Sequence, residues 1–292
     1  MEKILKLPGP LLIFFGAISL SFGGLIVKSF EGATLWQILF WRSLFFTLTV
    51  LAFLIINYKK KILKSFHTSG LPGFIGGIIL SFGFCGYVFA MYNTTVANTN
   101  FIISLQILFL AIFGYIFLKE KINVITLTSI VLAMTGVLVM IGNSLTPGEL
   151  SGNLAAFTMP ITFAVLIIIV RKYPKVDMVP AQFVAGVSSC LIGFFLSTKL
   201  MISPNDIFLG FLAGFFQVGF GFIFITIGAR TTPSAMVGII MLSESILGPI
   251  WAFLFVSERP SMSGLIGGAI ILSAVLLQFY SLLNKNKKSV SH

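Results

Sequence analysis

Apolar stretches follow one another along the whole chain, separated by short polar or charged turns. An α-helix needs about 20 apolar residues to cross the ~30 Å hydrocarbon core of a bilayer. Stretches of about this length predict ten transmembrane helices, at residues 9–28, 34–57, 70–91, 96–118, 123–142, 152–170, 178–198, 207–229, 235–256 and 261–283. The stretches are continuously apolar rather than alternating, which excludes a membrane β-barrel.

The composition supports an all-α integral membrane protein. The 292 residues are 57% hydrophobic and only 9% charged, whereas soluble domains contain about 25% charged residues. Both cysteines, Cys85 and Cys190, fall inside apolar stretches, and the chain has only two histidines, so neither a disulfide nor a metal site is predicted. The chain also lacks a phosphate-cradling loop, so ATP-driven transport is not predicted. No cofactor is predicted either.

The basic residues give the orientation. With ten helices and the N-terminus inside, the interior loops hold 15 basic residues and the exterior loops hold three, namely Lys28, Lys199 and Arg259. Cytoplasmic loops of membrane proteins carry the excess of Lys and Arg, so both termini are predicted to be cytoplasmic. The net charge of +11 does not indicate nucleic-acid binding, because the basic residues are scattered over short loops.

The chain repeats itself. Residues 71–121 align without a gap on residues 209–259, with identities that include Phe82-Gly83-Phe84 with Phe220-Gly221-Phe222, Ala97 with Ala235, and Glu120 with Glu258. Because each half has five helices, an odd number, the second half must have inverted topology in the membrane relative to the first, as in many secondary transporters. We therefore predict two repeats, at residues 1–146 and 147–292.

These features resemble a known family. Two five-helix halves, each carrying Ala-x22-Glu-[Lys/Arg] before its last Gly-containing helix, are similar to the EamA family of the drug/metabolite transporter superfamily. Here Lys119-Glu120-Lys121 and Ser257-Glu258-Arg259 keep the Glu and the following base but lack the preceding Gly of the family turn. The resemblance implies a central cavity walled by the first four helices of each half, with the fifth and tenth helices at the periphery.

Two predicted helices carry one polar residue near the middle. Glu244 follows Ala235 by nine residues, which places it ~13 Å deep at 1.5 Å per residue. An acid at this depth is expected to face a cavity, where it takes up a proton or attracts an ammonium group, although a neutral acid bonded to a neighbouring helix is the structural alternative. Gln106 holds the equivalent depth in the first half. Pro249 predicts a break or bend in the second-half helix, where the first half has Ala111.

Further candidates surround this pair. Arg42 lies inside the second predicted helix, where it can neutralise Glu244, bind a substrate carboxylate or extend outward to the interface. Trp41 and Trp251 are candidates for an aromatic wall around an amine. Tyr87 is a cavity candidate because its hydroxyl group needs a polar partner.

The sequence therefore predicts a secondary transporter of the cytoplasmic membrane for a small organic metabolite, such as an amino acid or amine. Alternating access around Glu244 and Gln106, with proton coupling, is the predicted mechanism. The alternative is a multidrug efflux carrier for lipophilic cations. An integral membrane enzyme would need clustered His, Asp or Cys at one interface, and a channel would not show saturable, counter-transport-stimulated flux. The expected partners are the small-molecule substrate and membrane lipids, and both a monomer and a homodimer remain open.

Overall fold

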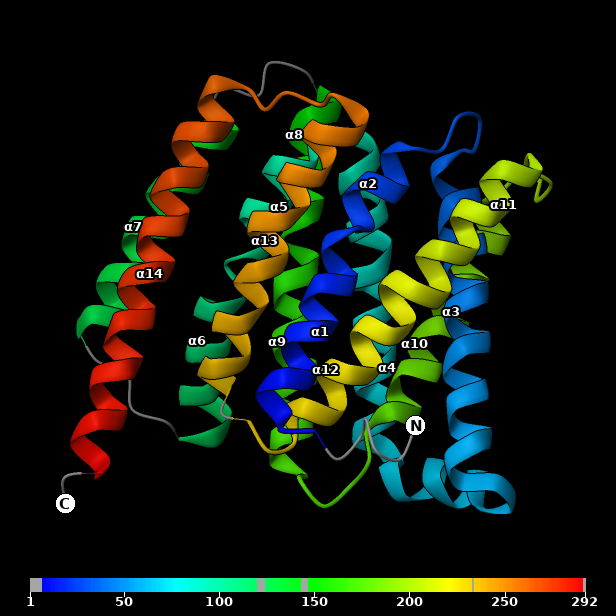
Figure 1. Ribbon diagram of the computed structural model, residues 1–292, viewed down its shortest axis with the longest axis horizontal. Helices are drawn as coiled ribbons and strands as arrows, with labels where there is room; N and C mark the ends of the chain where they lie inside the picture. The colour runs from blue at the N-terminus through cyan, green and yellow to red at the C-terminus, as the bar shows by residue number, and fades with distance from the viewer. Residues whose placement is uncertain (1–6, 120–123, 143–146, 233, 291–292) are drawn as a thin grey trace.

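The computed structural model describes residues 7–119, 124–142, 147–232 and 234–290, and every regular element among them is a helix (Figure 1). The helices before residue 143 are α1 (Gly9–Ser21), α2 (Gly23–Lys28), α3 (Leu35–Tyr58), η2 (Lys59–Lys61), α4 (Ile62–Asn93), α5 (Val96–Ile103), α6 (Gln106–Leu118) and α7 (Val124–Gly142). Those after residue 146 are α8 (Pro147–Ala156), α9 (Thr158–Lys172), α10 (Val179–Leu196), α11 (Pro204–Phe211), η3 (Leu212–Phe220), α12 (Gly221–Ala229), α13 (Ser234–Val256) and α14 (Met262–Val290).

Within the described residues, seven stretches are long and apolar enough to cross a membrane. They are Gly9–Lys28, Leu35–Asn93, Val96–Leu118, Gly148–Lys172, Val179–Leu196, Pro204–Ala229 and Met236–Val256, and Leu127–Val139 and Met262–Ala274 are shorter apolar helices. Large apolar side chains on the outside, such as Leu71, Leu138 and Phe195, are more than two-thirds exposed. A surface of this kind suits contact with lipid tails, so the protein is a multi-pass membrane protein.

The stretch Leu35–Asn93 contains two passes rather than one. A straight helix of its 59 residues would measure ~88 Å, about three times the hydrocarbon thickness. The chain turns where Lys59 has a φ of 48°, and it breaks again where Gly70 has a φ of 53°. The second break separates the segment 62–69 from the rest of α4, which explains why α4 begins eight residues before the predicted span at 70–91.

The polar turn between the third and fourth predicted helices lies where the sequence placed it, since α4 ends at Asn93 and α5 begins at Val96. Of the break or bend predicted at Pro249, the break is wrong, because α13 runs continuously through the proline, and the bend stays a prediction. The interruption falls in the first half instead, between α5 and α6 at residues 104–105.

Glycines set the closest helix contacts. On α4, Gly83 lies against Thr162 and Gly86 against Thr158 of α9. On α12, Gly221 lies against Leu20 and Gly228 lies against Ile13 of α1. In both pairs the residue numbers rise along one helix as they fall along the other, so the helices are antiparallel.

The pairs α3–α10 and α13 with α5–α6 are antiparallel by the same criterion. Gly186 meets Thr47 and Gly193 meets Phe40 in the first pair. Gly238 meets Ile107 and Gly248 meets Asn100 in the second pair. A Cβ atom at most of these glycines would overlap the neighbouring helix, which explains why the sequence keeps glycine there. The helices form one layered bundle, with α7 and α14 packed together at one side (Figure 1).

Candidate functional site

Arg42 lies in the interior of α3 with an exposed fraction of only 2%. Its guanidinium carbon is 5.0 Å from the ring centroid of Tyr87 and 5.3 Å from that of Phe84. Its Nε donates a hydrogen bond to Oε1 of Gln217 at 3.4 Å. A buried cation needs such partners because it has left its hydration shell. The side chain therefore turns into the bundle rather than out to the interface.

Gln217 belongs to η3, a nine-residue π-helical stretch. Such stretches are rare and often occur at functional sites. Nε2 of Gln217 donates to the carbonyl oxygen of Leu20 at 3.3 Å, close to the junction of α1 and α2. A Cβ atom at Gly23 would overlap both the Tyr87 hydroxyl group and the Gln217 amide. Polar groups from four parts of the chain therefore lie close together: α1–α2, α3, α4 and η3.

Glu244 lies in α13 with an exposed fraction of 3%. Trp251, two turns along the same face of α13, donates to Ser21, the neighbour of Leu20 whose carbonyl binds Gln217, so this face of α13 is turned toward the same part of the bundle. Within the described part of the chain, no hydrogen bond reaches its carboxyl group and no ion pair joins it to Arg42. The hydroxyl group of the adjacent Ser245 is also buried and has no partner. We call Arg42, Tyr87, Gln217 and Glu244 the polar centre.

Gln106 is the first residue of α6 and has an exposed fraction of 1%. Its Nε2 is buried without a hydrogen-bond partner. An amide left in this state costs free energy, so a group that accepts a hydrogen bond there would be stabilised. Among the described residues, no hydrogen bond joins Gln106 to a residue of the polar centre.

The two predicted tryptophans lie in different places. Nε1 of Trp41 donates to the carbonyl oxygen of Leu200 at 2.8 Å, which directs this ring toward the loop after α10. Nε1 of Trp251 donates to Oγ of Ser21 at 3.1 Å. The Trp251 ring stacks on Phe22 with a centroid distance of 5.2 Å and an interplanar angle of 7°. Trp251 therefore lies beside the α1–α2 junction that the polar centre also reaches.

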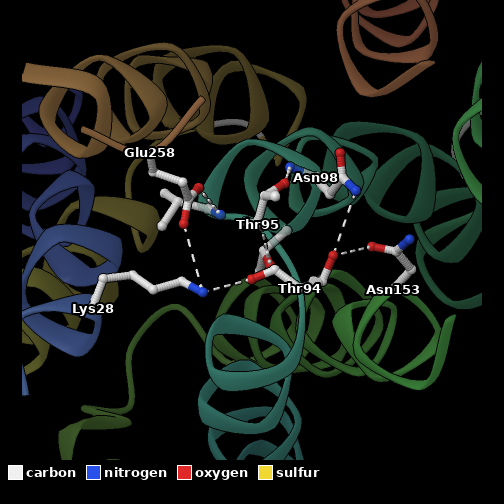
Figure 2. Close-up of polar contacts among 8 residues, drawn as sticks. Lys28, Thr94, Thr95, Asn98, Asn153 and Glu258 are labelled. Atoms are coloured by element: carbon white, nitrogen blue, oxygen red, sulfur yellow. Dashed lines mark hydrogen bonds and ion pairs between the residues drawn. The ribbon is translucent and has the colours of Figure 1, made fainter. Parts of the chain in front are cut away.

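A second polar cluster holds the upper end of the bundle together (Figures 1 and 2). Nζ of Lys28 lies 3.5 Å from Oε2 of Glu258 and donates to the carbonyl oxygen of Thr94 at 2.8 Å. Oε1 of Glu258 accepts a hydrogen bond from the backbone amide of Val96 at 2.6 Å, at the start of α5. Oγ1 of Thr94 donates to Oδ1 of Asn153 at 2.8 Å. We call these residues the upper latch, because they tie segments before residue 143 to segments after residue 146.

Sequence reasoning missed several of these residues. Gln217 and the latch residues Lys28, Thr94 and Asn153 were not proposed as functional. Gln217 gave the same signal as Gln106, a lone amide within an apolar run, and that signal could have found it. The latch gave no such signal, because its members are polar residues at helix ends, which are common in any membrane protein.

The fold and the polar centre define a polytopic helical membrane protein with charged groups in its interior. The model of the EamA-like transporter family matches residues 7–142 and 146–280, so the chain belongs to this family, which is part of the drug/metabolite transporter superfamily. A protein of Methanothermobacter thermautotrophicus that is named an uncharacterized transporter is 26% identical over 207 residues, which cover 65% of this chain and 58% of that protein. A solved crystal structure superposes with a TM-score of 0.67 over 95% of this chain and 98% of that chain, at 15% identity, and it supports the fold alone.

Proposed function

We propose that the protein is a secondary transporter for a small zwitterionic metabolite of the amino-acid type. The observation that carries the proposal is the polar centre, in which a buried arginine and a buried acid face the same part of the bundle without forming an ion pair with each other. A zwitterion complements this arrangement, since its carboxylate group can bind Arg42 and its ammonium group can bind Glu244. The transported substrate would then provide the charge partners that each residue lacks.

The proposed architecture is two inverted five-helix repeats, at residues 1–146 and 147–292, with ten membrane passes. Support comes from equivalent contacts in the two halves. Gly83 packs against α9, in the first predicted span of the second half, and Gly221, its counterpart 138 residues later, packs against α1, in the first predicted span of the first half. A half-turn about an axis in the membrane plane relates such pairs.

The proposed location is the cytoplasmic membrane, with both termini in the cytoplasm. The distribution of basic residues supports this orientation, and α1 begins at the same end of the bundle at which α14 ends (Figure 1). Cysteines introduced at Lys60 and Lys199 should react from opposite sides of intact cells. Reaction of both with an impermeant reagent from outside would refute the orientation.

Alternating access is the proposed mechanism. The upper latch closes one end, so the structure is interpreted as the state in which the exterior path is shut. Opening requires the Lys28–Glu258 ion pair and the Glu258–Val96 hydrogen bond to break while the other end closes. Proton exchange at Glu244 would couple this cycle to a pH gradient, because proton and ammonium group would compete for one carboxylate.

A multidrug efflux carrier is the second candidate. The stacked pair Phe22 and Trp251, with Phe216 also beside Phe22, offers aromatic surface near an acid. Lipophilic cations bind to such surfaces through cation–π attraction. This candidate needs Glu244 but gives Arg42 no role in substrate binding.

Thermal-shift screening of the purified protein separates the two candidates, since a ligand that binds the native state raises its apparent stability. The panel should contain zwitterionic amino acids, the matching amines that lack a carboxylate, the matching acids that lack an amine, and lipophilic cations. We expect stabilisation by zwitterions only, and loss of this stabilisation in Arg42→Gln. Stabilisation by amines and lipophilic cations that survives in Arg42→Gln would instead support the efflux carrier.

A further inference from the structure

A pocket lies where α3 turns into α4. This turn is at the lower end of the bundle, opposite the upper latch (Figure 1). The volume of the pocket is about 310 Å³, at the lower limit of the roughly 300–1,000 Å³ typical of ligand pockets. Four cationic side chains line it: Lys61, Lys64, Lys175 and Arg230. Asp177 is the single acid of its lining.

Both carboxylate oxygens of Asp177 already accept hydrogen bonds from the protein. Oδ2 of Asp177 accepts a hydrogen bond from the Tyr58 hydroxyl group, and Oδ1 accepts one from the backbone amide of Val179 at 3.0 Å. Within the described residues, no ion pair joins Asp177 or any other acid to the four cations. Arg230 donates through Nε to the carbonyl oxygen of Pro174 at 3.2 Å, which fixes the guanidinium group and leaves its terminal nitrogens for a ligand.

The local fold places these charges beside apolar side chains at the membrane edge. The segment 62–69 is separated from the rest of α4 by the break at Gly70. Leu63 in this segment is 80% exposed, and Leu71 just after it is 68% exposed. Exposed leucines next to exposed lysines are typical of a segment that lies in the interface between headgroups and acyl chains.

We propose that this pocket binds a phosphate-bearing anion, and that the headgroup of an anionic phospholipid is its source. Four cations without an acidic partner provide the charge, and Arg230 and the lysines provide donors for phosphate oxygens. Leu63 and Leu71, on the same segment but outside the pocket lining, are exposed apolar side chains that acyl chains can contact. A soluble phosphate has the same headgroup chemistry but makes no use of these leucines.

The site would join the two parts of the chain. Lys61 and Lys64 precede residue 143, whereas Lys175 and Arg230 follow residue 146. A bound anion would therefore hold these segments together at the lower end, as Lys28 and Glu258 do at the upper end. Binding itself does not depend on the proposed transport function.

The test uses the full-length protein, purified in a neutral detergent and titrated with phosphatidylglycerol, phosphatidylcholine or inorganic phosphate while bound lipid is counted by native mass spectrometry. The pocket variant is Lys64→Gln/Arg230→Gln. The matched control is Lys60→Gln/Lys172→Gln, which removes the same charge from exposed residues outside the pocket. Each basic residue near an anionic surface contributes roughly fivefold to affinity, so we expect the pocket variant to bind phosphatidylglycerol more than tenfold more weakly and the control to bind within about threefold of the parent.

Equal phosphatidylglycerol binding by the pocket variant and its control would overturn the proposal, as would equal binding of phosphatidylcholine and phosphatidylglycerol. Binding of inorganic phosphate that the pocket variant loses, without selectivity among lipids, would overturn the lipid source. If the double variant does not fold, Lys64→Gln and Lys64→Arg replace it. The proposal then requires weaker binding in the first variant and parental binding in the second.

Discussion

The helices α5–α6 and α13 occupy equivalent places in the two halves but differ in continuity. α5 and α6 cover Val96–Leu118, and α13 covers Ser234–Val256, exactly the residues 138 positions later. The first stretch is interrupted before Gln106, whereas the second runs unbroken through Glu244 and Pro249. The two stretches cross in opposite directions, with Gly238 against Ile107 and Gly248 against Asn100.

The difference shows that proline does not decide where this helix breaks. Oγ of Ser104 donates to the carbonyl oxygen of Phe101 at 2.6 Å, and the amides of Leu105 and Leu108 bond to carbonyls three residues earlier. A serine that bonds its own backbone can compete with the regular helical pattern, and the equivalent residue in α13, Leu242, cannot do so. Ser81 makes the same bond within continuous α4, so the Ser104 bond does not by itself account for the interruption. Pro249 is accommodated because neighbouring helices can support the backbone around it.

The largest effect on transport is expected when Glu244 is replaced by glutamine, the residue type that Gln106 provides in the first half. Glu244→Gln keeps the size and hydrogen-bonding capacity of the side chain but removes proton exchange. In proteoliposomes, we expect accumulation driven by a pH gradient to fall to background. The control is Glu31→Gln, the same substitution at an exposed acid. Unchanged pH dependence in Glu244→Gln would make Glu244 a structural residue.

The reciprocal change tests whether the two positions are interchangeable. Gln106→Glu, added to Glu244→Gln, restores an acid at the same depth but in α6. We expect no recovery of accumulation, because position 244 lies on the face of α13 that reaches the α1–α2 junction, whereas no hydrogen bond among the described residues joins Gln106 to Arg42 or Tyr87. Recovery would show that either helix can carry the coupling acid.

The second-largest effect is expected at Glu258, whose carboxylate accepts a hydrogen bond from Val96 at the start of α5. Glu258→Gln removes the partly exposed ion pair with Lys28 and weakens the charged hydrogen bond to Val96, together about 1–2 kcal/mol. The upper end should then open more often, by roughly tenfold for each 1.4 kcal/mol. A thiol reagent added from outside should modify Ser21→Cys about tenfold faster in this variant, with both native cysteines replaced by alanine.

Glu31→Gln again serves as the control, since it lies near the same end without joining the latch. A rate that is equal in the two variants would mean that the latch does not limit opening. A double-mutant cycle with Lys28→Gln would separate the ion pair from the hydrogen bond to Val96.

Much of this fold could be predicted from apolar length alone, because each pass must satisfy its backbone hydrogen bonds within a helix. The places where the helices are interrupted could not be predicted from apolar length. The break at Gly70 depends on local backbone geometry, the interruption at residues 104–105 has no proline or glycine to mark it, and the π-helical stretch around Gln217 has no proline or charge to mark it. For the candidate site, depth and polarity pointed to Glu244 and Arg42, but the approach of Gln217 to Arg42 depends on helix packing that one sequence does not encode in any short pattern.

A smaller effect is expected from Ser104→Ala, which removes the hydroxyl group that competes with the backbone. We expect α5 and α6 to join more regularly, so that the amides of Leu105 and Leu108 exchange with deuterium more slowly. The stability should change by no more than about 1 kcal/mol, because a lost hydrogen bond is offset by better helical bonding. Ser129→Ala, at another buried serine within a helix, is the control. Unchanged exchange would assign the interruption to packing against α13 instead.

The smallest effect is expected at Pro249. A proline has no amide hydrogen, so the carbonyl oxygen of Ser245 lacks its usual helical donor, next to the unpartnered Ser245 hydroxyl group and to Glu244. Pro249→Ala supplies that donor, and we expect slightly higher stability with about two- to threefold weaker binding of the ammonium-bearing substrate. Pro204→Ala, at the start of α11 where no carbonyl is released, should change neither. Equal affinity in Pro249→Ala and the parent would show that the Ser245 carbonyl does not reach the substrate. The continuity of α13 would then have no bearing on the chemistry beside Glu244.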